Sequence, residues 1–124
     1  MNLRIALALA FSLALPTLAA AQTAPKKEWL EHVEKNMPVA FCTQQAYFRQ
    51  CFNVTVQECE AAATSATRDC IDKHGPDVPS SLALPRDGQR WGGVIGKCAG
   101  TATELSMMKK RINSARCNDP KQWQ

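Results

Sequence analysis

The sequence predicts a small all-α domain, a disulfide-stabilised bundle of four to five short helices with a central α-hairpin. Three observations lead to this prediction. Apolar residues recur every three or four positions, as they do along one face of a helix, and no segment of useful length alternates as a strand would. The chain of 124 residues is short enough for one domain. Its six cysteines could supply the covalent links that a small core needs.

The N-terminus has the order of a cleaved export signal. A positive charge at Arg4 precedes an apolar run over residues 5–15, and small residues end the segment at Ala19 and Ala21. We therefore predict a signal peptide over residues 1–21 and a single helical, cysteine-rich domain over 22–124, located in the periplasm or secreted. The alternative is a retained N-terminal anchor, for which the run is short, because a membrane span needs roughly 20 apolar residues.

All six cysteines lie in the predicted mature domain, and an even number in a small exported domain indicates disulfide bonds. The alternative is a metal site. It lacks support because there is no C-x-x-C pair, and His32 and His74 have no other plausible ligand at helical spacing. We therefore expect neither a metal nor a cofactor. The residues predicted to form disulfides are Cys42, Cys51, Cys59, Cys70, Cys98 and Cys117.

The first helix is predicted from Lys26 to Asn36, with Trp29 and Val33 on its apolar face. Pro38 is expected to interrupt it, because proline lacks the amide donor and disfavours a helical residue before it. A second helix should then run from Pro38 to Phe52.

The third helix is predicted from Thr55 to His74. The segment Thr55-Val56-Gln57-Glu58 has the spacing of a capping box, and Gly75 with Pro76 provides a stop. Its apolar stripe is narrow and rich in alanine, so another helix could pack close to it. Residues 75–89 contain three prolines, two glycines and two serines, which is typical of an ordered loop.

Two more helices complete the predicted bundle. A weak one spans Arg90 to Ala99, and a strong one begins with the capping-box segment at residues 101–104 and continues towards Asn118. The expected apolar face of this last helix consists of Leu105, Met108, Ile112 and Ala115. Its other face is basic, through Lys109, Lys110, Arg111 and Arg116, which is typical of a solvated surface or of a surface for an acidic partner.

An antiparallel hairpin of the second and third helices would place Cys51 opposite Cys59 and Cys42 opposite Cys70. Nested bridges between these pairs are the predicted connectivity, which leaves Cys98 for Cys117. That third bridge is hard to close, because a straight helix from residue 102 to residue 116 spans roughly 22 Å while bridged Cα atoms lie within about 7 Å. The final helix must therefore stop early or bend, or the connectivity must differ.

One glycine-rich segment is the candidate binding site. Gly92, Gly96 and Gly100 would line one face of a helix, and each glycine costs about 0.8 to 1 kcal/mol relative to alanine, so some compensation is needed. One interpretation is close packing against another helix. The other is a smooth groove for a partner or ligand, and its predicted residues are Arg86, Arg90, Trp91, Gly92, Gly96 and Lys97.

The function follows by elimination. A formal net charge of +4, without a recognised nucleic-acid motif, does not indicate nucleic acid, and no catalytic signature identifies an enzyme. We therefore predict an exported, non-enzymatic protein-binding domain, such as an inhibitor, an immunity-type protein or an assembly accessory. The first alternative is a small carrier of apolar ligands, which a cavity at the bundle centre would favour. The second is a small periplasmic enzyme, which needs His74 or His32 to meet a serine or a carboxylate in a cleft.

Overall fold

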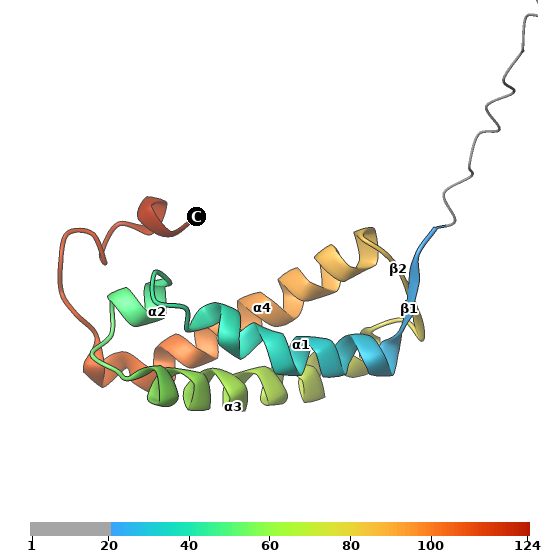
Figure 1. Cartoon of the computed structure of the whole chain (residues 1–124), viewed down its shortest axis with the longest axis horizontal. Coiled ribbons are helices and arrows are strands. Elements are labelled where there is room, and N and C mark those ends of the chain that lie inside the picture. The colour runs from blue at the N-terminus through green and yellow to red at the C-terminus, as the bar shows by residue number, and fades with distance from the viewer. Residues whose placement is uncertain (1–20) are drawn as a thin grey trace, which may run out of the picture.

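Three long antiparallel helices make up most of the protein in this computed structural model, which describes residues 21–124. Helix α1 (Lys26–Phe41) and helix α3 (Val56–His74) form an α-hairpin, and α4 (Arg86–Met107) runs back beside α3 (Figure 1). The predicted fold class, a small disulfide-stabilised all-α bundle, is confirmed. Residues 1–20, which hold nearly all of the predicted signal peptide, lie outside the described residues.

A short antiparallel strand pair closes the end of the bundle where α1 begins and α3 ends. Strand β1 (Thr23–Pro25) pairs with β2 (Ser81–Ala83), with Ala24 opposite Leu82. The side chain of Leu82 is fully buried, so this pair attaches the loop after α3 to the start of α1. Strands of three residues are too short to give the alternating pattern by which a sequence reveals a strand.

Helix α1 continues through Pro38 to Phe41, so the predicted interruption is wrong. An interior proline costs about 3 kcal/mol in an isolated helix. Here Val33 and Pro38 are both buried against the bundle, and this packing compensates for the lost hydrogen bond. The predicted second helix from Pro38 to Phe52 is therefore divided between the end of α1 and the four-residue helix α2 (Tyr47–Gln50).

Helix α3 agrees with its prediction. It begins after Thr55, which forms the predicted capping box with Glu58, and it ends at His74, where Gly75 and Pro76 open a 3₁₀ turn. Its buried residues follow the predicted alanine-rich stripe, and they are Cys59, Ala63, Ala66, Thr67 and Cys70.

Helix α4 replaces the two helices predicted over residues 90–99 and 101 onwards. No glycine among residues 21–124 adopts a positive φ, so Gly100 does not end the first segment. The Thr101 hydroxyl donates to the Lys97 carbonyl at 2.9 Å, as a residue inside a helix does, and does not form the predicted cap. The helix ends at Met107, and residues 111–119 contain no helix.

The buried stripe of α4 differs from the predicted apolar face. Ile95, Ala99, Thr103 and Met107 are buried at helical spacing. Leu105 follows Thr103 by two residues, which is about 200° around the helix. Leu105 therefore points away from the core and is 65% exposed. Two other residues of the predicted apolar face, Met108 and Ile112, are 45% and 40% exposed. The prediction failed because it assumed a helix that continues to Ala115, whereas α4 ends at Met107 and buries the face that continues from Ile95 and Ala99.

Three disulfides join segments that are distant in the sequence, and none matches the predicted nested pairs. The structure joins Cys42 to Cys59, Cys51 to Cys117 and Cys70 to Cys98, with Cα–Cα distances of 5.8, 5.5 and 5.9 Å. The nested prediction required a continuous helix over residues 38–52. Because the chain turns after Cys42 and α2 has a single turn, Cys42 reaches the first turns of α3, and Cys51 reaches the C-terminal tail. The early end of α4 leaves the chain that carries Cys117 free to approach Cys51.

The core has two clusters connected through Phe41. One contains Phe48, Phe52 and Met107 around the Cys42–Cys59 and Cys51–Cys117 bridges, and the other contains Val33, Ile95 and Ala99 beside Cys70. Phe48 and Phe52 lie with their ring centroids 5.8 Å apart. Two of the three bridges are thus part of the larger cluster and contribute apolar surface as well as covalent links.

Helix α1 lies against the glycine face of α4. A Cβ atom added at Gly96 would lie 3.6 Å from Met37 Cε, and one added at Gly100 would lie 3.8 Å from a ring atom of Phe41. Both distances are ordinary van der Waals contacts. Large α1 side chains therefore lie close to the α4 backbone at these two glycines, with room for one methyl group at each.

The Cys51–Cys117 bridge should contribute more stability than the Cys42–Cys59 bridge, because it closes 66 residues of chain and the other closes 17. In the chain-entropy estimate, the C51A/C117A variant loses about 4 kcal/mol and C42A/C59A about 3 kcal/mol. All four cysteines are buried, so the lost packing is similar in the two variants. Urea unfolding of both proteins measures the difference, and a larger loss in C42A/C59A would contradict the prediction.

The G96A variant should be more stable than the wild type by about 0.5 to 1 kcal/mol, because alanine restricts the unfolded chain and the added methyl group fits beside Met37. G88A is the matched comparison. Its Cβ would lie 3.0 Å from Leu84 Cδ2 and 3.4 Å from Trp29 Nε1, so it should gain less or lose stability. Thermal unfolding of the two variants tests this, and an equal loss in both would contradict it.

Candidate functional site

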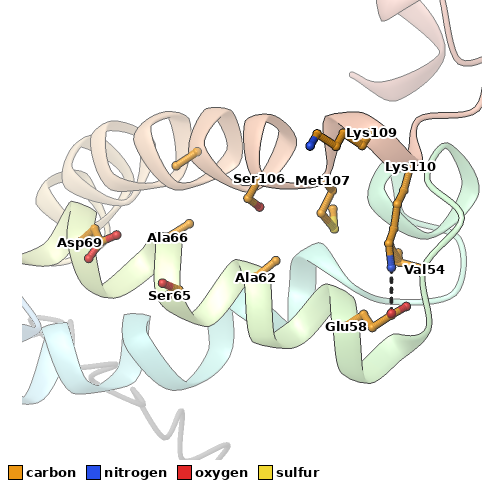
Figure 2. A pocket seen from close by; sticks show the side chains of 11 residues that line it. Val54, Glu58, Ala62, Ser65, Ala66, Asp69, Ser106, Met107, Lys109 and Lys110 are labelled. Atoms are coloured by element: carbon orange, nitrogen blue, oxygen red, sulfur yellow. Dashed lines mark hydrogen bonds and ion pairs between the residues drawn. The ribbon is translucent and has the colours of Figure 1, made fainter.

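The seam between α3 and α4 carries two consecutive hollows on the surface. The first has a volume of about 440 Å³ and lies towards the start of α3 (Figure 2). The second has a volume of about 500 Å³ and lies towards the end of α3, and Ala102 lines both. We call the two hollows together the α3–α4 groove.

Small side chains create the first hollow. Ala62, Ala66 and Ala102 line it, together with Ser65 and Ser106, and none of them is long enough to fill the space between the two helices. Figure 2 shows Ala62 and Ala66 on α3 facing Ser106 and Met107 on α4. The remaining lining residues are Val54, Glu58, Asp69, Met107, Lys109 and Lys110.

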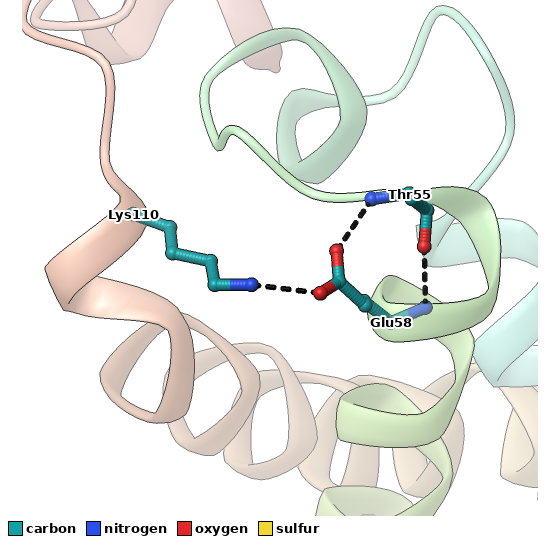
Figure 3. A network of polar contacts seen from close by, with 3 residues as sticks. All are labelled: Thr55, Glu58 and Lys110. Carbon is teal, nitrogen blue, oxygen red and sulfur yellow. Dashed lines mark hydrogen bonds and ion pairs between the residues drawn. The ribbon is translucent and has the colours of Figure 1, made fainter.

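A polar network closes one end of this hollow (Figure 3). The Thr55 amide donates to Glu58 Oε2 at 2.8 Å, and the Glu58 amide donates to Thr55 Oγ1 at 3.1 Å. Lys110 Nζ donates to Glu58 Oε1 at 2.8 Å. The hydrogen bond from Lys110, and then that from the Thr55 backbone, lower the pKa of Glu58 below its ordinary value. A carboxylate with a lowered pKa is a poor general base. The role of the network is therefore structural: it connects the start of α3 to the 3₁₀ turn that follows α4.

The second hollow is apolar with a basic rim. Val94 and Leu105 are 37% and 65% exposed and lie on the α4 side, and Cys98 is bridged there to Cys70 of α3. Lys73 and Lys97 stand on the two helices that border it. The other lining residues are His74, Thr101 and Ala102.

The structure separates the six residues of the predicted binding site. Arg86 forms an ion pair with Asp87 at 3.0 Å, and the Arg90 guanidinium lies 5.4 Å from the ring centroid of Trp91. A Cβ added at Gly92 would lie 3.9 Å from Trp29 of α1, and Gly96 faces Met37 as described above. Lys97 lies on the rim of the second hollow. A binding role for the set of six stays a prediction, and Lys97 is the member that lines the groove.

Sequence reasoning missed most of the groove. The spacing of Leu105 predicts a place on the apolar face of the last helix, and the alanines of α3 indicate only a surface for close packing. The signal present in the sequence was the run of small residues over 61–66, which leaves the seam side of α3 without large side chains.

The candidate metal ligands and catalytic side chains of residues 21–124 lie apart from one another. Within residues 21–124, no group of three or more histidine, cysteine, aspartate or glutamate side chains could hold a metal ion. His74 lines the second hollow, whose lining contains no serine or carboxylate to pair with it. His32 Nδ1 lies 3.1 Å from the side-chain amide of Asn36 on the exposed face of α1. Among residues 21–124, none of the helices combines the length and the hydrophobicity that a membrane-spanning segment requires.

A smaller hollow of about 310 Å³ lies where the C-terminal tail returns to the bundle. The Tyr47 hydroxyl donates to Glu104 Oε1 at 2.8 Å, and burial, followed by this hydrogen bond, raises the pKa of Tyr47. Trp123 lies 5.4 Å from Tyr47 between ring centroids, and its Nε1 donates to the Arg116 carbonyl. These contacts hold the tail that carries Cys117.

The E58Q variant should lose stability at neutral pH, because glutamine keeps the capping-box acceptor but removes the charge that pairs with Lys110. The folded-state pKa of Glu58 lies below its ordinary value of 4.5, so the carboxylate stabilises the fold above that value. This contribution is lost as the pH falls from 4.5 through the folded-state pKa, so the difference between the wild type and E58Q should shrink over that range.

Urea unfolding from pH 7 to pH 3 measures this convergence. E60Q is the control, because Glu60 is on the same helix and forms no ion pair within residues 21–124. A constant difference between E58Q and the wild type over the whole range would show that the ion pair is not responsible.

Comparison with known proteins places the chain in a family. Residues 23–117 match the family model described as T2SS substrate NttA, where T2SS is the type II secretion system. The matched range includes all six cysteines and both hollows of the α3–α4 groove. Neither a curated protein nor a solved structure matches the chain. The chain therefore belongs to the NttA family of type II secretion substrates, and it is a secreted protein.

Proposed function

We propose that this secreted domain acts by binding another protein through the α3–α4 groove and that it is not an enzyme. The observation that carries the proposal is the exposure of Val94 and Leu105 in the second hollow of the groove that α3 and α4 leave unfilled. Scattered exposed apolar side chains are normal, but a group of them beside a hollow is typical of an interaction surface.

The disulfides support this proposal because they make the groove rigid before a partner arrives. Cys70–Cys98 joins the two helices that form the groove, and Cys42–Cys59 anchors the start of α3. A surface that is already ordered loses less conformational entropy on binding, so more of the contact energy contributes to affinity.

We further propose that the mature domain begins at Gln22, after cleavage of residues 1–21, and that its bridges form in the periplasm before release. Disulfides form and persist in oxidising compartments such as the bacterial periplasm and the cell exterior. Three bridges in so small a domain are typical of such proteins.

Binding of a small apolar ligand is supported less well. Sites for small molecules usually enclose 70–90% or more of the ligand surface. Both hollows of the groove include exposed lining residues, among them Lys109 in the first and Leu105 in the second. A small ligand would therefore stay largely in water, whereas a protein partner could cover the whole groove.

Site-specific photo-cross-linking tests the proposed function. A photoreactive amino acid at position 105 should give a discrete cross-linked product with a partner protein in a cell extract, because Leu105 is the most exposed apolar residue that lines the groove. The same amino acid at position 39 is the matched control, since Val39 is 53% exposed on α1 and does not line the groove.

Competition makes this experiment specific. Unlabelled wild-type protein should suppress the product from position 105. The L105D variant should suppress it at least about tenfold less well, because an aspartate cannot replace a leucine that the partner would bury. Equal cross-linking at positions 105 and 39, or equal competition by the two proteins, would reject the proposal.

A further inference from the structure

The chemistry of the α3–α4 groove also identifies the kind of partner. We propose that its occupant is an amphipathic helix of another protein, with an apolar stripe that enters the groove and acidic side chains along its flanks. This inference rests on the proposed function, because it names the partner of the same surface.

The length and shape of the groove suit a helix. The two hollows follow one another along α3 from Glu58 to His74, a distance of about 24 Å at 1.5 Å per residue. A partner helix of about 16 residues has the same length. Adjacent helices pack with their axes 8–10 Å apart, so a helix can lie in the channel between two others where their facing side chains are small. Ala62, Ala66 and Ala102 are the small residues at that position.

The backbone of the groove favours a helix over an extended peptide. Both walls are α-helices, whose interior amides and carbonyls are already paired within α3 and α4. An extended peptide would therefore find few backbone partners and would leave its own polar groups unsatisfied. A helix satisfies these groups internally and presents its side chains at i, i+4, i+7 and i+11, which is the usual pattern of helix-in-groove recognition.

The charges around the groove favour an acidic partner. Lys73, Lys97 and Lys109 line the two hollows, and none of them forms an ion pair within residues 21–124. Two carboxylates are also present. Glu58 is already paired with Lys110, which leaves Asp69 against three lysines. In the first hollow Lys109 and Lys110 balance Glu58 and Asp69, whereas Lys73 and Lys97 line the second hollow without a carboxylate. The rim is therefore basic at the second hollow, and acidic side chains on a partner would complement it there.

The same charges disfavour a second copy of this chain as the occupant. In a symmetric dimer the same surface of each protomer faces the other. Lys97, beside Leu105 on α4, would then meet the basic rim of the other protomer, and like charges at an interface oppose association. A flat anionic membrane would meet the lysines, but it would not reach the recessed alanines between the helices.

A synthetic peptide of about 16 residues provides the test. It is a hydrocarbon-stapled helix with leucines at i, i+4, i+7 and i+11 and glutamates on both flanks. A second peptide replaces every glutamate with lysine, and a third keeps the composition but scrambles the leucine positions. We expect the first peptide to bind the wild-type protein at least about tenfold more tightly than either of the others, as measured by fluorescence anisotropy.

Variants of the protein locate the binding. L105D should weaken binding of the acidic peptide at least about tenfold, and K73E and K97E should each weaken it about fivefold. V39D and K121E are the matched controls and should bind as the wild type does, because neither residue lines the groove. Raising the salt concentration from about 0.05 to about 0.5 M should weaken binding to wild type more than to K97E.

Several outcomes would overturn the inference. These are equal binding of the acidic and basic peptides, peptide-induced amide shifts on α1 in place of α3 and α4, dimerisation that L105D abolishes, and binding to phosphatidylglycerol vesicles through Lys73 and Lys97 without peptide binding. If the acidic peptide fails while position 105 still cross-links a protein, the nature of the partner is wrong and the proposed function stands. Loss of the cross-link would instead reject the proposed function.

Discussion

The covalent attachment of α3 at two points is the constraint on which the rest of the structure depends. Cys59 joins its first turns to the end of α1, and Cys70 joins its last turns to the middle of α4. A small bundle has little core to determine how its helices are placed, so two fixed points on one helix restrict the possible arrangements strongly. The two bridges therefore restrict the positions of α1 and α4 relative to α3, and the noncovalent contacts between the helices add to this restriction.

This attachment allows the two sides of α4 to differ. Towards α1, the side chains of Trp29, Met37 and Phe41 lie close to the α4 backbone at its glycines and fill the space between the two helices. Along the seam with α3, alanines and serines face one another and space remains. A helix pair held only by side-chain packing would tend to close such a gap, because unfilled volume between helices loses dispersion contacts. The Cys70–Cys98 bridge and the Glu58–Lys110 ion pair hold the two helices near opposite ends of the groove, so the groove can persist.

Local signals in the sequence predicted local structure well. The capping box at Thr55 and Glu58 and the stop at Gly75 placed α3 correctly, because each of these signals acts within a few residues. Where a distant contact outweighs the local preference, the prediction failed. Pro38 stays inside α1 because its side chain is buried, and Gly100 stays inside α4 because Phe41 packs against it. The groove depends on the same kind of distant contact, so of the six predicted binding residues only Lys97 lines it, although the basic residues Lys109 and Lys110 were also noted in the sequence.

The amino-acid sequence by itself determined the all-α class, the presence of disulfides and the limits of α3, because apolar period, cysteine number and capping residues are properties of neighbouring positions. The tertiary structure alone decided which cysteines pair, where α4 ends and which of its faces meets water. These depend on how segments far apart in the chain are placed in space. Leu105 shows the difference: its spacing to Met108 is helical, but only the position of α1 and α3 around α4 determines that both are exposed.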